Sequence, residues 1–268
     1  MVATNHFMPD NLFQFAHIPA RLRERAGQLA WHDFSRVFAR ADHVTTPTRL
    51  AAGLLCDKGW TREVEAVSCG IDLHRFQPQP QRWARQRFAL ADRPTILFVG
   101  RLEEEKRLEE LIQALPHVLN GVDAQVVLVG TGGKRAVLER LAARLGVGGR
   151  VRFLGFVPDA DLPQLYSVAD VFAMPGIAEL QSIATLEAMA SGLSVVAADA
   201  MALPHLVADN GYLYRPGDVQ ELARHLTAVL TSAELRASMG RASLALAATH
   251  DHQRSLARFE EIYAELAA

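Results

Sequence analysis

Residues 95–130 read TILFVGRLEEEKRLEELIQALPHVLNGVDAQVVLVG, and this stretch decides the fold. It opens and closes with an apolar, β-branched run that ends in glycine, at 95–99 and 124–129. Between these runs apolar residues recur at helical spacing, and Pro116 is expected to kink or shorten that helix. Near-continuous apolar strands joined by a helix are typical of a parallel sheet covered on both faces. The stretch therefore predicts an α/β domain.

The same alternation continues towards the C-terminus. We expect strands at 151–154, 169–174, 194–198 and 211–214, and helices near 137–145, 162–167 and 182–191. Three more helices are expected after residue 218. The predicted fold class is α/β, a doubly wound parallel sheet of the Rossmann-like type, in which ligands bind at the carboxyl ends of the strands. Functional residues are therefore expected just after Val99, Val129, Leu154 and Met174.

The first fifty residues follow a different pattern, a short extended start and then mostly helix. Apolar residues recur at helical spacing, and four arginines lie largely off that stripe: Arg21, Arg25, Arg36 and Arg40. A basic amphipathic helix either lies on an anionic membrane or packs against a neighbouring element, and we favour the packing. A short strand at 65–68 and a Pro-, Gln- and Arg-rich connection at 77–87 lead into the α/β domain.

Composition narrows the class of protein. The 268 residues are 50% hydrophobic and carry a formal net charge of −2, which suits a large buried core and does not suggest a nucleic-acid partner. Cys56 and Cys69 show no zinc or redox spacing, and so few cysteines indicate a reducing compartment. No stretch approaches the ~18 apolar residues of a membrane span, and residues 1–13 do not look like a signal peptide. We expect a cytoplasmic protein, with peripheral attachment to the inner face of the membrane as an alternative.

The first strand end carries two cations. Gly100 lets the backbone turn tightly or approach a ligand closely. Arg101 follows it directly and Lys106 lies near the start of the next helix, so the two can clamp a diphosphate, arginine as a fork and lysine as a point charge. Alternatively, both pair with the acidic run 103–105 as a solvated charge cluster. The residues alone leave both interpretations open.

The next two strand ends are less specific. The second, GTGGK at 130–134, is neither GxGxxG nor a Walker A loop, and a tight turn is favoured over a phosphate cradle. The missing GxGxxG also disfavours a dinucleotide-dependent oxidoreductase. The third, FLGFV at 153–157, either brackets a flat base or belongs to the core, and the residues alone favour the core.

The fourth strand end is the most informative, with GIAELQSIATLEAMASG at 176–192. Glu179 lies in the loop and Glu187 in the following helix, with seven residues between them. The helix begins near Ser182, so free N–H groups around Ile183 form an anion site with about half a positive charge. Carboxylates beside it suit sugar and ribose hydroxyls. The alternative is a pair of surface charges, but Glu187 stands in an apolar stretch, where a carboxylate needs a partner.

Together these segments resemble glycosyltransferase family 4, retaining enzymes with two facing Rossmann-like domains (the GT-B fold). The resemblance runs from about residue 41 to the end. It rests on four motifs: Val-Gly-Arg-Leu-x2-Glu-Lys at 99–106, Glu-x7-Glu at 179–187, Gly-Phe-Val at 155–157 and Ser-x-Gly-Ile-Asp at 68–72. It implies three parts: a helical remnant of the N-terminal acceptor domain at 1–66, a nucleotide-sugar donor domain at 67–250, and a helix at 251–268 that crosses back to the N-terminal domain.

The resemblance also implies a site for the donor diphosphate. Arg101 and Lys106, which follow Gly100, would bind the diphosphate and stabilise its departing charge. Backbone amides at Ser182 and Ile183 would bind the same group. No metal cofactor is expected, because enzymes of this fold generally need none. Asp159-Ala160-Asp161 matches the metal motif of the other large glycosyltransferase fold, but here it is interpreted as a helix cap.

Sugar, ribose and base are assigned in the same way. Glu179 would contact the transferred sugar, Glu187 would bind the ribose hydroxyls, and the backbone at Phe156 and Val157 would hold the base. Thr4-Asn5-His6 looks like the Thr-x-His that ends a strand of the acceptor domain, which makes His6 a candidate catalytic residue. The run at 5–12, with Glu-Leu-Gln-Ser-Ile-Ala at 179–184, looks most like bacterial diacylglycerol glucosyltransferases.

Two features depart from the family pattern. Many members have Phe-Gly where this chain has Gln181-Ser182, and the chain begins at the Thr-x-His strand, so most of the acceptor domain is expected to be missing. The expected function is hexosyl transfer from a donor of the UDP-glucose or GDP-mannose type to a lipid or glycan acceptor. The alternative is a nucleotide-sugar-binding module that truncation makes catalytically incompetent.

Overall fold

The computed structural model describes residues 1–6, 20–79 and 82–267, and the chain divides into two compact units. The smaller unit comprises Met1–Gly70 and His252–Ala268, and the larger unit comprises Ile71–Asp251. Within the described ranges, no helix combines the length and the apolar character needed to span a bilayer. Most of the run at 5–12 that suggested diacylglycerol glucosyltransferases lies outside these ranges.

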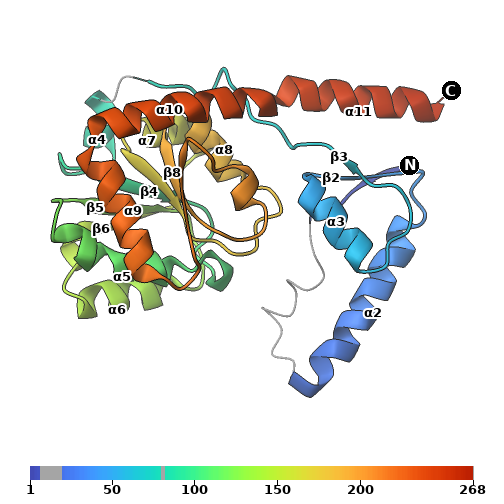
Figure 1. Ribbon diagram of the computed structural model, residues 1–268, viewed down its shortest axis with the longest axis horizontal. Helices are drawn as coiled ribbons and strands as arrows, with labels where there is room; N and C mark the ends of the chain where they lie inside the picture. The colour runs from blue at the N-terminus through green and yellow to red at the C-terminus, as the bar shows by residue number, and fades with distance from the viewer. Residues whose placement is uncertain (7–19, 80–81, 268) are drawn as a thin grey trace. The chain divides into compact units, whose positions relative to one another are not determined.

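A parallel sheet of six strands forms the centre of the larger unit, in the order β6-β5-β4-β7-β8-β9 (Figure 1). The strands are β4 (Thr95–Val99), β5 (Gln125–Val129), β6 (Val151–Gly155), β7 (Val171–Met174), β8 (Ser194–Ala198) and β9 (Gly211–Tyr214). Every residue of β4, β5, β7 and β8 is buried, because helices cover both faces of the sheet. The predicted doubly wound α/β fold is confirmed.

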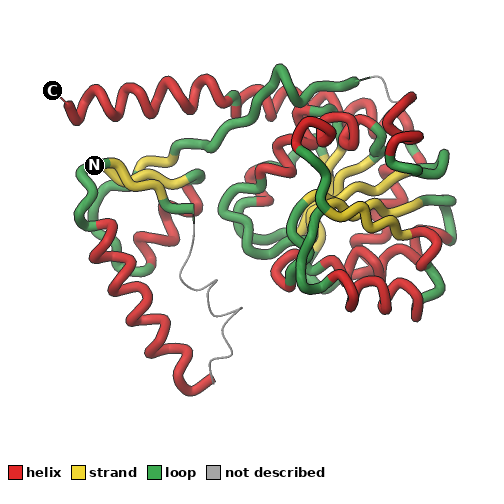
Figure 2. Tube along the Cα trace, turned by 180° about the vertical axis from the view of Figure 1, so that it is seen from behind, coloured by secondary structure: helices red, strands yellow, loops and turns green. Residues whose placement is uncertain are grey.

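The helices of the larger unit form two layers around the sheet (Figures 1 and 2). In one layer α5 packs against α6 and α9, and in the other α8 packs against α7 and α10. The α-helices are α4 (Arg82–Arg87), α5 (Leu108–Leu119), α6 (Arg135–Arg144), α7 (Leu162–Ser167), α8 (Ile183–Ala190), α9 (Val219–Thr231) and α10 (Ala233–Ala247). Short 3-10 helices are η2 (Glu104–Lys106), η3 (Gly148–Arg150), η4 (Asp159–Asp161), η5 (Leu203–His205) and η6 (Ala248–His250).

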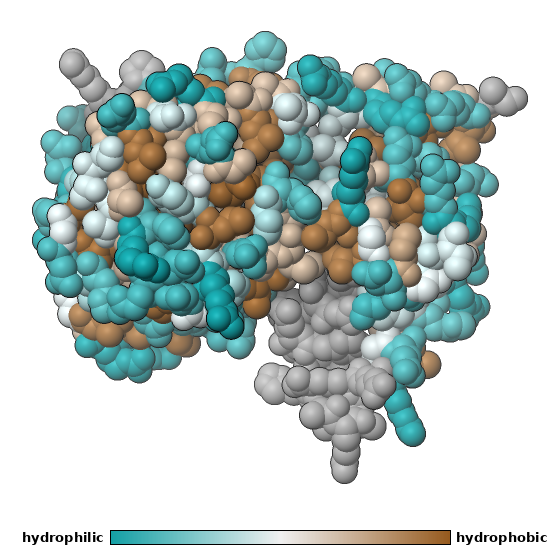
Figure 3. Space-filling model, in the orientation of Figure 1, coloured by the Kyte–Doolittle hydropathy of each residue, from teal (hydrophilic) through white to brown (hydrophobic). Residues whose placement is uncertain are grey.

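Two details of the larger unit differ from expectation. Pro116 lies in the last turn of α5 and the helix continues past it, so the proline does not shorten the helix. The connection at 77–87 contains the short helix α4. On the face seen in Figure 3, hydrophobic and polar side chains are interspersed over the larger unit, as on most protein surfaces.

The smaller unit is built on a second parallel sheet, in the order β1-β2-β3 (Figure 2). Its elements are β1 (Val2–Thr4), α2 (Ala20–Phe38), β2 (His43–Thr46), α3 (Arg49–Asp57), β3 (Glu65–Ala66) and α11 (His252–Ala267). The sequence pattern of this part predicts mostly helix and does not indicate β2. The strand has only four residues, HVTT, which is too short for an apolar period to stand out between two helices.

An ion-pair cluster links α11 to the sheet of the smaller unit. The Arg258 guanidinium on α11 donates to Glu65 on β3, with Nε 2.6 Å from Oε1, and His43 Nε2 lies 2.9 Å from Glu65 Oε2. The hydrogen bond from Arg258 holds the pKa of Glu65 below its ordinary value. The C-terminal helix therefore belongs with residues from the beginning of the chain.

Candidate functional site

Glycines mark the carboxyl ends of three neighbouring strands in the larger unit. Gly100 follows β4, Gly130 follows β5 and Gly155 ends β6, and all three have positive φ, of +154°, +123° and +72°. The Gly100 N–H donates to Val129 O at 2.9 Å, and the Gly130 N–H donates to Gly155 O at 2.8 Å. A Cβ on Gly130 would lie 2.0 Å from Gly100 O, so neighbouring backbones meet here without room for a side chain.

Gly130→Ala is expected to lower the free energy of unfolding by about 1–3 kcal/mol, because alanine strongly disfavours the φ of +123° and its Cβ would meet a carbonyl oxygen. Urea unfolding measures this change. Gly149→Ala is the matched control, since a Cβ there meets open space. Its expected change is within about 0.5 kcal/mol. Equal stabilities of the two variants would contradict the prediction.

The loop after β5 packs against the loop after β4. The Leu102 N–H donates to Thr131 O at 2.8 Å, and the Lys134 N–H donates to Leu102 O at 2.9 Å. A Cβ on Gly132 would lie 2.3 Å from Leu102 O. These contacts agree with the interpretation of GTGGK as a tight turn that supports the neighbouring loop.

The two cations after β4 have different partners. Arg101 donates to Glu105 Oε1 at 2.8 Å, and its side chain is 65% exposed. The Lys106 ammonium pairs instead with Glu179 Oε1 in the loop after β7, and these side chains are only 14% and 10% exposed. In this structure Arg101 therefore pairs with the acidic run, as the charge-cluster interpretation predicts. Lys106 does not, and it links the loop after β4 to the loop after β7.

The Lys106–Glu179 pair lies at the topological switch point of the sheet. From β4 the chain adds β5 and β6 on one side, and β7 lies on the other side. The crevice between two such strand ends is where doubly wound sheets bind ligands. Backbone hydrogen bonds hold both loops in place, from Ile177 N–H to Glu105 O and from Ala202 N–H to Glu179 O, each at 3.0 Å. A Cβ on Gly176 would come within 2.9 Å of Glu179 Oε1, so the glycine leaves room for the carboxylate.

Glu105 is a residue of this site that sequence analysis did not single out. Its side chain is 7% exposed, and while Oε1 accepts from Arg101, Oε2 has no hydrogen-bond partner among the described residues. A buried carboxylate oxygen without a hydrogen-bond partner is unfavourable. The hydrogen bond from Arg101 to the other oxygen, Oε1, limits the cost of burying this carboxylate. Glu105 thereby orients the Arg101 side chain at the strand end.

The helix after β7 begins at the same edge. Ser182 precedes α8 and is 1% exposed, and it accepts a hydrogen bond from the Thr185 hydroxyl at 2.8 Å instead of capping the helix. The first-turn N–H groups of a helix have no acceptor within the helix. With the helix dipole they provide the equivalent of about half a positive charge for an anion.

Glu187, on the second turn of α8, has the partner that its apolar surroundings require. The Tyr166 hydroxyl on α7 donates to Glu187 Oε2 at 2.7 Å. Burial raises the pKa of Glu187, while this hydrogen bond and the nearby Arg75 oppose the rise. The interpretation of Glu187 as a surface charge is wrong. Tyr166 is a site residue that the sequence does not indicate, because nothing in the local spacing of α7 shows which carboxylate its hydroxyl meets.

Tyr166→Phe is expected to destabilise the protein by about 1–3 kcal/mol, because Glu187 loses a buried donor. The pKa of Glu187 should then rise further, since the hydroxyl at present lowers it. Urea unfolding at neutral pH measures the first effect. Tyr212→Phe is the control, since the Tyr212 hydroxyl makes no hydrogen bond to the described residues. A loss no larger than that of the control would show that the hydrogen bond contributes nothing.

The remaining predicted positions are distributed as follows. Phe156 is 75% exposed, so the core interpretation of 153–157 is wrong for this residue. It holds for Val157, which is 7% exposed, and Phe153 and Leu154 pack partly buried against the core. His6 lies in the smaller unit, where its Nδ1 is 3.8 Å from Cys69 Sγ, and its catalytic role stays a prediction.

Asp161 makes no capping hydrogen bond and pairs with Arg87, so the helix-cap interpretation is wrong. Among the described residues, no three His, Cys, Asp or Glu side chains are grouped to hold a metal ion.

Comparison with known proteins identifies the family. The sequence model of the family described as glycosyl transferases group 1 matches residues 81–245, and this chain belongs to that family. The matched region contains every predicted donor-site residue of the larger unit.

The chain is similar to curated and solved members. It is 34% identical over 218 residues to the GDP-mannose-dependent alpha-(1-6)-phosphatidylinositol monomannoside mannosyltransferase of Mycolicibacterium smegmatis, covering 76% of this chain and 57% of that protein. Anabaena HepE in complex with UDP and glucose aligns with a TM-score of 0.85 and 25% identity, over 98% of this chain and 71% of HepE. The C-terminal domain of the group 1 glycosyl transferase LpcC from Francisella tularensis aligns with a TM-score of 0.62 and 26% identity, over 67% of this chain and 97% of that domain.

Proposed function

We propose that this chain carries the donor site of a retaining glycosyltransferase, which moves a hexose from a nucleoside diphosphate sugar to a lipid or glycan acceptor. The observation that carries the proposal is the Lys106–Glu179 pair at the switch point of the sheet. It places a partly buried ammonium and a buried carboxylate at the edge where α8 begins. A cation and a helix N-terminus suit a diphosphate, and a carboxylate suits sugar hydroxyls.

Each part of the donor has a proposed partner. The diphosphate would lie against Lys106, Arg101 and the first amides of α8 at Ser182 and Ile183, with Gly100 allowing close approach. During transfer the bond between the anomeric carbon and the diphosphate oxygen breaks, a bond to the acceptor hydroxyl oxygen forms, and the hydroxyl proton passes to the departing diphosphate. Negative charge then develops on the departing diphosphate, where these cationic groups stabilise it.

The sugar, ribose and base complete the proposed donor complex. Glu179 would hold hydroxyls of the transferred hexose, and Glu187 would hold those of the ribose. The base would lie against the backbone at Phe156 and Val157, where the exposed Phe156 ring leaves apolar surface to cover it. The proposed donor is of the UDP-glucose or GDP-mannose type. Support comes from the GDP-mannose-dependent relative and from HepE, which was solved with UDP and glucose.

The acceptor and the cellular location form a second part of the proposal. A lipid acceptor is supported by the Mycolicibacterium smegmatis relative, whose substrate is a phosphatidylinositol monomannoside. The smaller unit would be part of the acceptor domain and would contribute His6. The proposed location is the cytoplasm, with peripheral attachment to the inner face of the membrane through α2 as the alternative. The exposed Arg25 and Arg36 on α2 favour contact with anionic lipid.

A second candidate function is nucleotide-sugar binding without catalysis. It is favoured by one observation, that every residue proposed to hold the donor lies in the larger unit, between Gly100 and Glu187, whereas His6 lies in the smaller unit. The chain spans 57% of the length of its mannosyltransferase relative. Binding requires only the larger unit, whereas transfer to an acceptor also needs the surface that holds the acceptor.

Calorimetric titration with UDP-glucose, GDP-mannose and NAD separates these functions, combined with an assay of donor hydrolysis. Saturable binding of one sugar nucleotide together with its slow hydrolysis supports the transferase. Binding without turnover supports the module. Binding of NAD but of neither sugar nucleotide would overturn both.

A further inference from the structure

The motif Ser-x-Gly-Ile-Asp at 68–72 has no part in the proposed donor complex, but its last residue fixes a turn of the larger unit. The Asp72 carboxylate accepts hydrogen bonds from the N–H groups of His74 and Arg75, each at 3.0 Å. The Phe76 N–H donates to Asp72 O at 2.9 Å, and Phe76 is buried. Aspartate side chains often fix turns by holding the amides that follow them. This turn therefore sets the position of the Arg75 backbone.

The Arg75 side chain lies against the elements that surround Glu187. Its guanidinium donates to the main-chain oxygen of Asp159 in η4, and its Cζ lies 5.0 Å from the centre of the Phe76 ring. Phe76 packs edge-to-face against Tyr166, with the ring centres 5.9 Å apart. Among the described residues, no carboxylate forms an ion pair with Arg75. The positive charge of Arg75 is therefore not neutralised by a direct partner.

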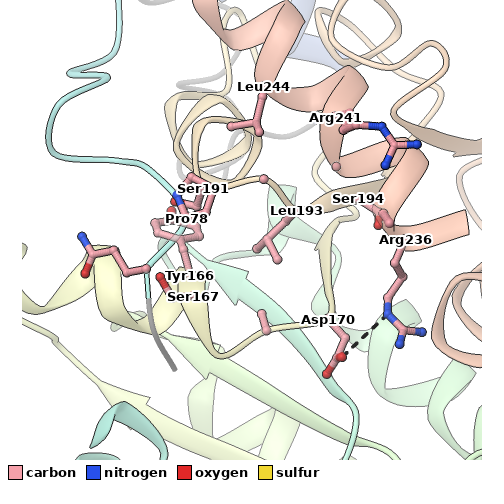
Figure 4. Close-up of a pocket in the computed structure, with 15 residues that line it drawn as sticks. Pro78, Tyr166, Ser167, Asp170, Ser191, Leu193, Ser194, Arg236, Arg241 and Leu244 are labelled. Atoms are coloured by element: carbon pink, nitrogen blue, oxygen red, sulfur yellow. Dashed lines mark ion pairs between the residues drawn. The ribbon is translucent and has the colours of Figure 1, made fainter. Parts of the chain in front are cut away.

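Tyr166 holds one oxygen of Glu187 and leaves the other available. The buried Tyr166 ring packs against both Phe76 and Phe172, and it borders the cavity drawn in Figure 4. Its hydroxyl donates to Glu187 Oε2 at 2.7 Å. Glu187 Oε1 makes no hydrogen bond to the described residues, and the side chain is partly exposed. A ligand can therefore reach Oε1 while Oε2 stays with the tyrosine.

Three neighbouring groups influence the charge of Glu187, which is itself the only charged residue of α8. Burial raises the pKa of Glu187, the hydrogen bond from Tyr166 on α7 opposes the rise, Arg75 also lowers the pKa, and Asp159 in η4 raises it. An opposite charge nearby favours the ionised form of a carboxyl group. The charge state decides the chemistry, because an ionised carboxylate accepts on both oxygens, whereas the protonated acid turns one of them into a donor.

We propose that Arg75 is a positioning residue of the ribose subsite, which acts through Glu187 and does not itself touch the donor. Its unpaired positive charge would keep the Glu187 carboxylate ionised, so that Oε1 accepts a hydrogen bond from a ribose hydroxyl while Oε2 accepts from Tyr166. The hydrogen bond to Asp159 O would hold the guanidinium beside η4, which directly precedes α7. The inference rests on the proposed function, because it takes the ribose assignment of Glu187 from it.

Carbon-13 NMR of the side-chain carboxyl groups, from about pH 4 to 8, measures the pKa of Glu187 directly, and Glu187→Gln assigns its signal. Arg75→Gln should raise this pKa and Asp159→Asn should lower it, because the two charges have opposite signs. Arg75→Lys keeps the charge and should stay close to wild type. Arg87→Gln is the matched control, since Arg87 pairs with Asp161 in the same η4, and it should leave the pKa unchanged. An unchanged pKa in Arg75→Gln would overturn the proposal.

Calorimetric titration of the full chain with UDP-glucose and with GDP-mannose over the same pH range measures the consequence for the donor. Each diphosphate is esterified at both ends, so its own charge stays constant. Arg75→Gln should bind like wild type at about pH 8, bind at least two-fold more weakly at about pH 5, and be rescued by Arg75→Lys. An equal loss at every pH would indicate a structural role and overturn the proposal. If neither sugar nucleotide binds wild type, the proposed function fails, and a raised pKa of Glu187 in Arg75→Gln would still show that Arg75 controls its charge.

Discussion

Lys106→Met is expected to weaken the binding of UDP or GDP by about 10- to 100-fold, because the diphosphate loses a charged donor. A hydrogen bond to a charged group contributes about 1.5–3 kcal/mol, and 1.4 kcal/mol is ten-fold in affinity. Lys106 is 14% exposed and lies beside α8, so its charge acts in a partly desolvated place. Calorimetric titration with the nucleoside diphosphate measures the change. Inorganic pyrophosphate should lose affinity by a similar factor.

The same substitution leaves Glu179 buried without its partner. Removing one member of a buried ion pair costs about 3–5 kcal/mol of stability. The double variant Lys106→Met with Glu179→Gln should regain most of that stability but not the affinity for diphosphate. Lys134→Met is the control, because Lys134 pairs with the 79%-exposed Glu104 at 3.1 Å, a contact that contributes at most about 1 kcal/mol. If Lys106→Met bound UDP or GDP as tightly as this control does, Lys106 would not belong to the donor site.

Glu187→Ala is expected to weaken the binding of UDP or GDP by about 10- to 100-fold, because the ribose hydroxyls lose a charged acceptor. Pyrophosphate has no ribose, so its affinity should not change. This contrast separates the two substitutions, since Lys106→Met should affect both ligands. Equal losses for UDP and pyrophosphate in Glu187→Ala would contradict the ribose assignment and indicate a general disturbance of α8. Glu187→Gln, which keeps one acceptor oxygen, should lose less affinity than Glu187→Ala.

Glu187 should also make stability depend on pH. Burial raises its pKa in the folded state above the ordinary 4.5, so the folded protein holds this proton more tightly than the unfolded chain. Below pH 4.5 the carboxyl is protonated in both states and costs nothing. As pH rises from 4.5 through the raised pKa of the folded state, stability falls. Urea unfolding across this pH window should show that the free energy of unfolding falls in the wild type and falls less in Glu187→Gln. If both proteins lost stability equally with pH, the assignment of this pH dependence to Glu187 would be contradicted.

Much of the candidate site could be predicted from local sequence patterns. An apolar run that ends in glycine indicates both a buried strand and the point where the backbone can approach a ligand. The start of α8 near Ser182 was predicted within one residue, and with it the position of free amide groups. Each of these features is determined by residues that are close together in the chain, so the local sequence is enough to predict it. The short strand β2 escaped prediction because its four residues pair with strands that are distant in sequence.

The sequence by itself determined the strand and helix alternation, the doubly wound fold and the edge of the sheet where the candidate site residues lie. Only the tertiary structure decided which of those residues meet. Lys106 and Glu179 are 73 positions apart in the sequence. They pair because β7 lies next to β4 in the sheet and not beyond β6. Tyr166 reaches Glu187 because α7 and α8 pack together. Apolar periodicity specifies how each element is buried but not its neighbour, so charge partners and buried hydrogen bonds follow only from strand order and helix packing.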